Sequence, residues 1–471
     1  MIQKTIKAIL LTIFLILTDL SQAQNKTLEY VIETSFSFAN SKTLPFWLTA
    51  NRFGTVTDTD NLTITANLFS EFRAPKKSID FAYKVSFISS IAQENKFFID
   101  ELYGSIRHQK IQLDLGVKHD EILWEGLSTS NGNIAKSINA RSFPGYNLQS
   151  VGYLQLPFAK KWLSFKANYG DYLLDDYSTI DNARLHAKSL YFKSRLSSKT
   201  ELITGLNHYA QWGGTSAILG KQPSGFKDYL KIVTGSSGGS DALETDQINA
   251  LGNHLGSYLL QLNHKGNKID WSFYWSHPFE DRSGREMMNY PDGLYGLHFD
   301  FKKPTQLVTH LNIEFYNTQH MSGTSGYYYD ENGNLQIGSG ADNYFNNGVY
   351  TSGWTYFGRT IGTPLFTPEA PVNGITNGIK LGYNRLIAYN ISFKGFLSPA
   401  IQYKTHLSYT KYKGWFDEPP KNDEILRTIL ECYFKNISLP FEITIGAAAD
   451  FDTYSKSNIG GFIKLTKRGQ F

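Results

Sequence analysis

The chain has 471 residues, of which 41% are hydrophobic, 15% aromatic and 19% charged, and its formal net charge is +4. This length allows two or three soluble domains or one large barrel. The mean hydropathy of −0.32 excludes a bundle of membrane-spanning helices, each of which needs about 20 apolar residues in a row. The small net charge gives no argument for nucleic acid as a partner. Cys432 is the only cysteine, which excludes an intramolecular disulfide and a cysteine-based metal site.

Residues 1–23 have the features of a secretory signal peptide. Two lysines precede an apolar run at 8–17, and residues 21–23 (Ser-Gln-Ala) resemble a cleavage site between small residues. We therefore expect export and cleavage of this segment, with residues 24–471 forming the mature protein.

Several segments of the mature chain alternate between apolar and polar residues. Such alternation indicates β-strands with one apolar and one polar face. Lys166, Glu314 and Lys404 all fall on the polar face, where we expect a watery lumen; facing lipid, each would cost about 2–4 kcal/mol near the midplane. The alternating segments are residues 163–170, 269–276 (IDWSFYWS), 307–316, 401–410 and 441–448.

The connections between these segments differ in length. Short ones such as 108–110 and 265–267 mostly alternate with long ones such as 119–145, 213–253 and 322–377. Bacterial outer-membrane barrels have short periplasmic turns and longer outer loops. Counting strands between the connections predicts an all-β fold, a transmembrane antiparallel β-barrel of about 18 strands. A large soluble sandwich or propeller is the alternative, although no fixed-period repeat supports a propeller.

One long connection carries helical spacing instead. We predict a small helical insert at about 222–254, and we expect such helices to cap or plug the barrel lumen, with a mobile surface loop as the alternative. Asp241 and Glu244 resemble a capping box for the second of two short helices. The apolar positions that follow helical spacing are Phe226, Tyr229, Leu230, Val233, Ile248, Leu251 and Leu255.

Catalytic and cofactor-binding motifs are missing from the sequence. Its one Gly-x-Ser-x-Gly match, residues 235–239, falls in the link between the two expected short helices and not at a strand-to-helix turn, and it has no His-Glu-x-x-His and no dinucleotide or Walker glycine pattern. The one tight acid/base cluster is His119, Asp120 and Glu121 at the start of a long loop, which we interpret as a solvated loop start or a local ion pair. We expect no catalytic residue, no metal and no cofactor.

The long connections are rich in aromatic, amide and arginine side chains. Sugars stack their C–H faces on aromatic rings and accept hydrogen bonds from amide and guanidinium groups. Arginine also pairs with acidic sugars, which adds Arg282 and Arg285 to the possible contacts. An ordinary girdle of Trp and Tyr at the membrane interface is the alternative explanation. Our predicted glycan-binding residues are Trp47, Asn51, Arg52, Trp124, Arg141, Tyr146, Trp212, Tyr290, Trp354, Tyr356 and Arg359.

These loops resemble those of the Wzi-type capsule assembly proteins of Bacteroidetes-like bacteria. The resemblance implies an outer-membrane barrel with helical elements that acts as a lectin for capsular polysaccharide and performs no catalysis. The sequence departs from the family in showing no separate helical bundle before the first strand. The segments that carry the resemblance are 45–55 (PFWLTANRFGT), 118–121 (KHDE), 124–127 (WEGL), 139–146 (NARSFPGY), 211–214 (QWGG), 246–254 (DQINALGNH), 289–294 (NYPDGL) and 358–365 (GRTIGTPL).

The leading hypothesis is therefore a non-enzymatic, lectin-like outer-membrane protein without a cofactor that anchors or assembles capsular or extracellular polysaccharide at the cell surface. Its expected partners are that polysaccharide, outer-membrane lipid and the polysaccharide-export machinery, and we expect a monomer. Two alternatives from other classes stay open, a passive carbohydrate porin and a barrel-embedded hydrolase that uses His119.

Overall fold

The structure is a computed structural model that describes residues 28–73, 79–159, 161–176, 179–240, 242–243, 246–247, 250–303, 306–322, 327–329, 331–337, 342–368, 381–413, 423–435, 439–453 and 456–471. The predicted signal peptide at 1–23 lies outside the described residues. Within the described ranges, no helix has the length and apolar character needed to cross a membrane.

Long strands make up most of the described chain. In chain order they are β1 (Glu29–Ala39), β2 (Asn61–Ser70), β3 (Ile79–Ile91), β4 (Lys96–His108), β5 (Ile111–Val117), β6 (Pro144–Ser150), β7 (Leu154–Gln155), β8 (Leu163–Leu174), β10 (Ala183–Arg195), β11 (Thr200–Trp212), β14 (Asn253–Lys265), β15 (Asp270–Phe279), β16 (Gly293–Asp300), β17 (His310–Asn317), β22 (Leu386–Ser398), β23 (Ile401–Tyr412), β24 (Glu424–Phe434), β25 (Glu442–Asp452) and β26 (Asn458–Gln470).

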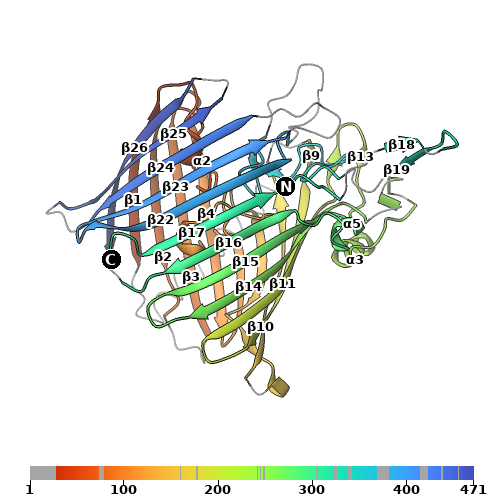
Figure 1. Ribbon diagram of the computed structural model, residues 1–471, viewed down its shortest axis with the longest axis horizontal. Helices are drawn as coiled ribbons and strands as arrows, with labels where there is room; N and C mark the ends of the chain where they lie inside the picture. The colour runs from red at the N-terminus through yellow and green to blue at the C-terminus, as the bar shows by residue number, and fades with distance from the viewer. Residues whose placement is uncertain are drawn as a thin grey trace.

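These strands form one closed antiparallel barrel (Figure 1). Each strand pairs with its neighbours along the chain, and β1 closes the ring on β26, with Glu29 opposite Gln470 and Ala39 opposite Gly460. The sheet contains 19 strands in the described ranges, but β7 continues β6 because both pair with β8, which leaves 18. Closure removes the free strand edges, and the predicted fold and strand number are confirmed.

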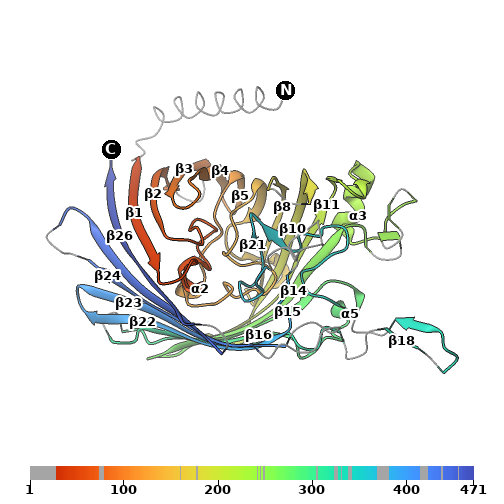
Figure 2. The ribbon, with the colours of Figure 1, turned by 90° about the horizontal axis from the view of Figure 1, so that it is seen from above.

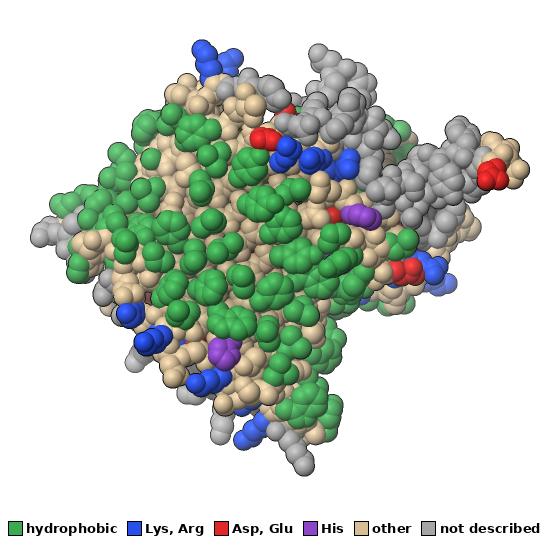
Figure 3. All heavy atoms as spheres, viewed as in Figure 1, with side chains coloured by type: hydrophobic (Ala, Val, Ile, Leu, Met, Phe, Trp, Pro, Cys, Tyr) green, Lys and Arg blue, Asp and Glu red, His purple; other side chains and the backbone are tan. Residues whose placement is uncertain are grey.

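The two faces of the wall follow the predicted alternation. On β15, Tyr274 and Ser276 point inward and are fully buried. Phe273, on the other face, pairs with Leu297 of β16, which is exposed. Hydrophobic side chains therefore spread over the outside of the strands, whereas several Lys and Arg lie near the lower edge of the view, where the short turns are (Figure 3). An apolar outer band is what a barrel wall presents to lipid.

Short elements occupy the longer connections. We call the end of the barrel that carries these connections the loop end and the opposite end the turn end. The short elements are α2 (Phe46–Thr49), the 3-10 helices Trp124–Gly126 and Pro157–Ala159, β9 (Ile180–Asp181), β12 (Thr215–Ser216), β13 (Gly220–Lys221), α3 (Phe226–Thr234), α5 (Arg282–Arg285), β18 (Tyr327–Tyr329), β19 (Leu335–Ile337), β20 (Thr355–Tyr356) and β21 (Arg359–Thr360).

Helix α3, the described helix of the insert, does not enter the lumen. Helix α3 lies outside the ring of strands (Figure 2), and its Tyr229 contacts Tyr169 and Trp212. Those two residues share the outward face of β8 and β11, because the inward face is made by their buried neighbours. The expectation that this insert plugs the lumen is therefore corrected for α3. Asp241, Glu244 and Ile248 of the second predicted helix lie outside the described residues, and Leu255 belongs to β14 rather than to a helical stripe.

Candidate functional site

Three connections fold back into the barrel and bind one another there. We call residues 40–60, 118–143 and 342–368 the plug; α2 and β21, which belong to it, lie inside the ring of strands in Figure 2. The Phe53 amide donates to the Ile138 carbonyl across 2.8 Å, and the Thr363 amide donates to the Ile134 carbonyl across 2.9 Å. Residues of the second and third segments also share one hydrophobic core with the inward face of the wall. The barrel is thus filled by its own connections.

A buried carboxylate on the wall holds the middle segment of the plug. Glu314 of β17 accepts hydrogen bonds from the Ser128 hydroxyl at 2.5 Å, the Thr129 amide at 2.9 Å and the Tyr274 hydroxyl at 2.7 Å. Only 1% of Glu314 is exposed. The sequence-based expectation that this residue faces a watery lumen is therefore wrong, because the plug covers it and supplies the hydrogen bonds that water would otherwise give.

Carboxylates on other strands hold the first segment. Asp450 of β25 accepts from the Phe46 amide at 2.8 Å. Glu431 of β24 accepts from Arg52 at 2.6 Å and pairs with Lys404 of β23 at 3.0 Å. Phe46 begins α2, and the first amides of a helix have no partner within the helix, so the Asp450 carboxylate satisfies one of them and helps to fix the position of the segment.

The third segment is fixed in the same way by residues at the loop end. Glu280, which follows β15, accepts from the Phe345 amide at 2.5 Å. The Tyr356 hydroxyl donates to Asp175 at 2.5 Å. Burial raises the pKa of Glu280 well above its usual range. One acidic residue or more therefore anchors each plug segment.

Most of the predicted aromatic residues pack inside this plug. Trp47 is buried and stacks on His406, with ring centroids 4.9 Å apart. Trp124 stacks on Tyr274 at 4.3 Å. Trp354 is fully buried and donates from its indole to the Ala135 carbonyl at 2.7 Å. Tyr356 is also buried. The protein itself covers these rings, so in this structure they help to fill the lumen.

The predicted polar residues of the plug are likewise engaged. The Asn51 amide group donates to the Thr129 carbonyl at 2.7 Å. Arg359 pairs with Asp58 at 2.5 Å. The guanidinium of Arg141 lies over the rings of Phe98 and Phe357, 3.6 and 4.4 Å from their centroids; burial lowers the pKa of Arg141.

Three predicted residues lie outside the plug. The Tyr146 hydroxyl donates to Asp171 on the outward face at 2.6 Å. Trp212 is buried under the insert, with the Arg184 guanidinium 4.8 Å from its ring. Tyr290 is 61% exposed and has the most open ring of the predicted set.

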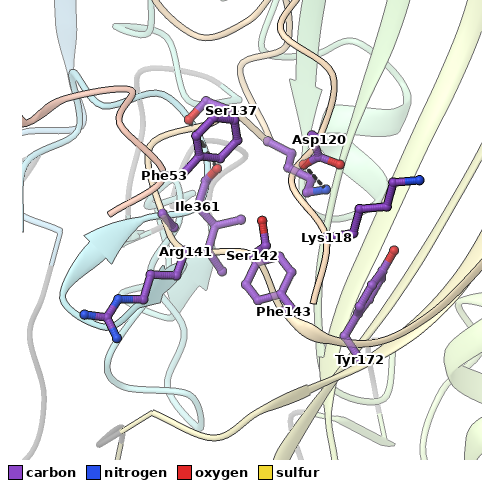
Figure 4. A pocket seen from close by; sticks show the side chains of 11 residues that line it. Phe53, Lys118, Asp120, Ser137, Arg141, Ser142, Phe143, Tyr172 and Ile361 are labelled. Carbon is purple, nitrogen blue, oxygen red and sulfur yellow. Dashed lines mark hydrogen bonds and ion pairs between the residues drawn. The ribbon is translucent and has the colours of Figure 1, made fainter. Parts of the chain in front are cut away.

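A small cavity lies between the plug segments and the wall (Figure 4). Phe53, Lys118, Arg141 and Tyr172 are among the residues that line it, and its volume is about 30 Å³. A cavity of this size holds about one water molecule. It is therefore too small to admit a sugar ring.

A much larger groove, of about 1,030 Å³, lies at the loop end between the insert and residues 279–285 and 342–349. Arg282 and Arg285 line it, as the sequence suggested for acidic sugars, but none of the eleven predicted residues does. The groove also carries amide, carboxylate, ammonium and phenol groups, which are the hydrogen-bonding partners of a glycan. These side chains include Lys188, Asp246, Tyr258, Asp281, Asp342, Asn343, Asn346 and Asn347.

Sequence reasoning missed most of the groove because its parts come from distant segments. The asparagine-rich run at 342–348 (DNYFNNG) was the available signal, since amides are common in sugar sites. Burial raises the pKa of Asp342 to about 6. Hydrogen bonds from Ser322 and Ser283 favour the charged form and lower the pKa, but their effect is smaller than that of burial. The groove therefore carries an acid that titrates just below neutral pH.

One group of side chains in the described part of the chain could supply ligands to a cation. Oxygen and nitrogen atoms of Asp100, Glu101 and His119 lie within 4.8 Å of one another. A bulge in the pairing of β3 with β4 turns both adjacent acids inward. Lys84 already pairs with Glu101, and His119 stacks on Phe53 at 3.8 Å. The ammonium of Lys84 would compete with a metal for the same carboxylate.

A closed 18-strand barrel with an apolar outer band and its lumen filled by its own loops defines the class of occluded outer-membrane-type barrels. The family follows from the sequence: the model of the capsule assembly protein Wzi family matches residues 49–369. The chain belongs to this family. The matched range contains most of the plug and the whole groove.

A solved structure shows the same architecture. The chain is similar to Wzi of Escherichia coli, described as an outer membrane protein involved in group 1 capsule assembly and a carbohydrate-binding β-barrel. The two share 14% identity over 95% of this chain and 86% of that one, with a TM-score of 0.56. OpdQ of Pseudomonas aeruginosa is similar at 8% identity over 95% of this chain and all of its own, with a TM-score of 0.49. These identities show the fold alone. No curated protein matches the chain.

Proposed function

We propose that this chain is a non-catalytic lectin of the outer membrane that holds capsular or extracellular polysaccharide at the cell surface. Its membership of the capsule assembly family is the observation that carries the proposal. The signal peptide at 1–23 delivers the chain, and the loop end, with its long connections, faces outward as in bacterial barrels generally.

The glycan lies in the 1,030 Å³ groove. Arg285 is exposed there, and within the described residues no carboxylate pairs with its guanidinium. Asn347 uses its side-chain oxygen to accept from the amides of Val349 and Tyr350, which orients its NH₂ group away from those amides. An arginine and an amide that line the same groove can hold a carboxylate and hydroxyls of an acidic sugar. Repetition along the polymer raises the avidity above that of a single contact.

The plug supports a holding role over a passive porin. The wall carboxylates Glu314, Glu431 and Asp450 tie its segments across the lumen, so diffusion of sugars would require several buried hydrogen bonds to break. A hydrolase based on His119 receives less support, because the ring of that residue is engaged by Phe53 and Asp100.

Binding of the purified protein to polysaccharide from its own cells tests the groove. We expect the R285A/N347A double variant to lose binding by about tenfold or more, since two charged or polar contacts contribute about 1 kcal/mol or more each. Y290A is the matched control, because Tyr290 is an exposed aromatic residue that lines neither the groove nor the plug. Loss of binding in Y290A with full binding in R285A/N347A would place the glycan elsewhere.

The cellular role has its own test. Cells that carry only R285A/N347A should release polysaccharide into the medium and keep less of it attached, while Y290A cells keep the normal amount. Unchanged attachment in cells that lack the protein altogether would reject the holding role.

A further inference from the structure

The outward face of the wall beneath α3 is polar where a barrel is expected to be apolar. Asp171 of β8 and His186 and Lys188 of β10 lie on this face, since Leu190, two residues further along β10, is exposed beside the lipid-facing surface. His186 bonds to Asp171 at 2.9 Å. Charged side chains that face lipid are destabilising, so this patch needs a cover.

Helix α3 provides that cover. The Tyr229 hydroxyl donates to Asp171 at 2.7 Å, and the Lys188 ammonium donates to the Val233 carbonyl near the end of the helix. Ile232 is fully buried with Ala210, Trp212 and Leu251 in a small core between insert and wall. The helix therefore occupies the position that lipid takes along the rest of the wall.

The other side of α3 is apolar and basic. Phe226 is 76% exposed and Leu230 is 49% exposed, and their spacing of four residues places them side by side on the helix. Lys227 and Lys231 form a second row with the same spacing. In the described residues, neither lysine has a carboxylate partner. A helix with an apolar row and flanking lysines is suited to the interface between lipid tails and headgroups.

A groove of about 520 Å³ runs between the start of α3 and the wall. Leu173 and Tyr146 line it and are exposed on the same outward face as the apolar band, so the groove continues the lipid-facing surface. Arg184 lines it too and is exposed. Its guanidinium stacks on Trp212, and no acidic partner for it is present among the described residues.

We propose that α3 and this groove bind an anionic lipid of the membrane leaflet at the loop end. Phe226 and Leu230 enter the apolar part of that leaflet, an acyl chain lies along Leu173, and the cations Arg184, Lys227 and Lys231 attract the headgroup phosphate. Continuity with the lipid-facing wall and the uncompensated positive charge both favour an anionic lipid over a protein as the occupant of this surface. This inference does not depend on the glycan function.

Depth in the membrane is the first test. In a C432S background, a bimane label is placed at Phe226→Cys and the protein is reconstituted into vesicles that contain brominated phosphatidylcholine. We expect quenching as strong as for a label at Leu407→Cys, which is exposed on the wall, and little quenching for a label at Lys221→Cys in the exposed strand β13. A label at 226 that behaves like the one at 221 overturns the proposal and leaves this surface to a protein partner.

Lipid choice is the second test. Detergent-solubilised protein is offered equimolar phosphatidylglycerol and phosphatidylcholine, and retained lipid is counted by native mass spectrometry. We expect the unmodified protein to prefer phosphatidylglycerol. In the variant R184Q/K227Q/K231Q this preference should fall about fivefold for each cation removed, because each cation contributes about that factor at an anionic surface. The control K110Q/K265Q/K303Q removes three exposed charges at the turn end. Equal preference in both variants overturns the headgroup assignment, and unchanged heat-modifiable migration shows that both are folded.

Discussion

The Arg52 guanidinium, on the first plug segment, donates to the Glu431 carboxylate of β24 across 2.6 Å. Glu431 is 98% buried at its side chain, and Arg52 is 29% exposed. Lys404 of β23 completes the group at 3.0 Å. This pair holds a loop segment against a strand of the wall. Contacts of this kind keep the plug in the lumen.

Replacement of Arg52 with alanine should loosen the first plug segment. Glu431 would keep Lys404 but lose one charge-assisted hydrogen bond, which stabilises by about 2 kcal/mol. We expect R52A to show frequent opening in planar bilayers, whereas the native protein shows no steady large conductance. R282A is the control, because Arg282 is largely exposed and pairs with Glu286 on the surface. Steady large conductance of the unmodified protein would contradict the closed plug.

Replacement of Trp354 with alanine should destabilise the plug without unfolding the barrel. The indole is fully buried, so its removal leaves a cavity and costs about 3–5 kcal/mol. The barrel strands are paired independently of it, so we expect protease cleavage within 342–368 while the heat-modifiable barrel persists. Y290A, which truncates an exposed ring, should change stability by less than about 0.5 kcal/mol. Equal protease resistance of W354A and the native protein would show that the segment is held in another way.

The packing of the segment at 342–349 should weaken as the pH rises. The pKa of Asp342 is raised to about 6, so the folded segment binds this proton more tightly than the unfolded segment does. Its favourable contribution is complete below the unfolded pKa near 4 and is lost as the pH rises through 6. Hydrogen-exchange protection factors of this segment should thus be larger at pH 5 than at pH 7.5.

The variant D342N separates this effect from others. It cannot ionise, so protection at pH 7.5 should rise towards the value at pH 5, and the difference between the two conditions should shrink. D300N alters a half-exposed carboxylate near the turn end, 42% of whose side chain is exposed, and should leave the difference as it is. A D342N protein with an unchanged pH response would assign the effect to a different group, such as Glu280.

Local patterns were sufficient for the wall. The alternation at 269–276 correctly placed Tyr274 inward, and the strand number near 18 followed from counting connections, because the period of two and the turn signals are properties of neighbouring residues. The resemblance at 45–55, 118–146 and 358–365 also pointed to the right family. These short-range regularities need no knowledge of what lies across the barrel.

Long-range packing decided the rest. Trp47 and Trp354 belong to loops that the sequence placed in contact with glycan, yet they are buried against His406 and Ala135, hundreds of residues or many strands away. An aromatic residue in a loop has the same local pattern whether its ring meets a sugar or a neighbouring segment. Only the folded arrangement distinguishes the two.

The amino-acid sequence by itself determined a two-faced wall of about 18 strands and the family to which the chain belongs. The tertiary structure alone decided that the loops fill the lumen, that α3 covers the outside and that a groove opens between distant segments. The reason is physical: strand faces are set by the geometry of adjacent residues, whereas plugs and grooves arise from contacts between segments whose separation along the chain carries no signal of their meeting.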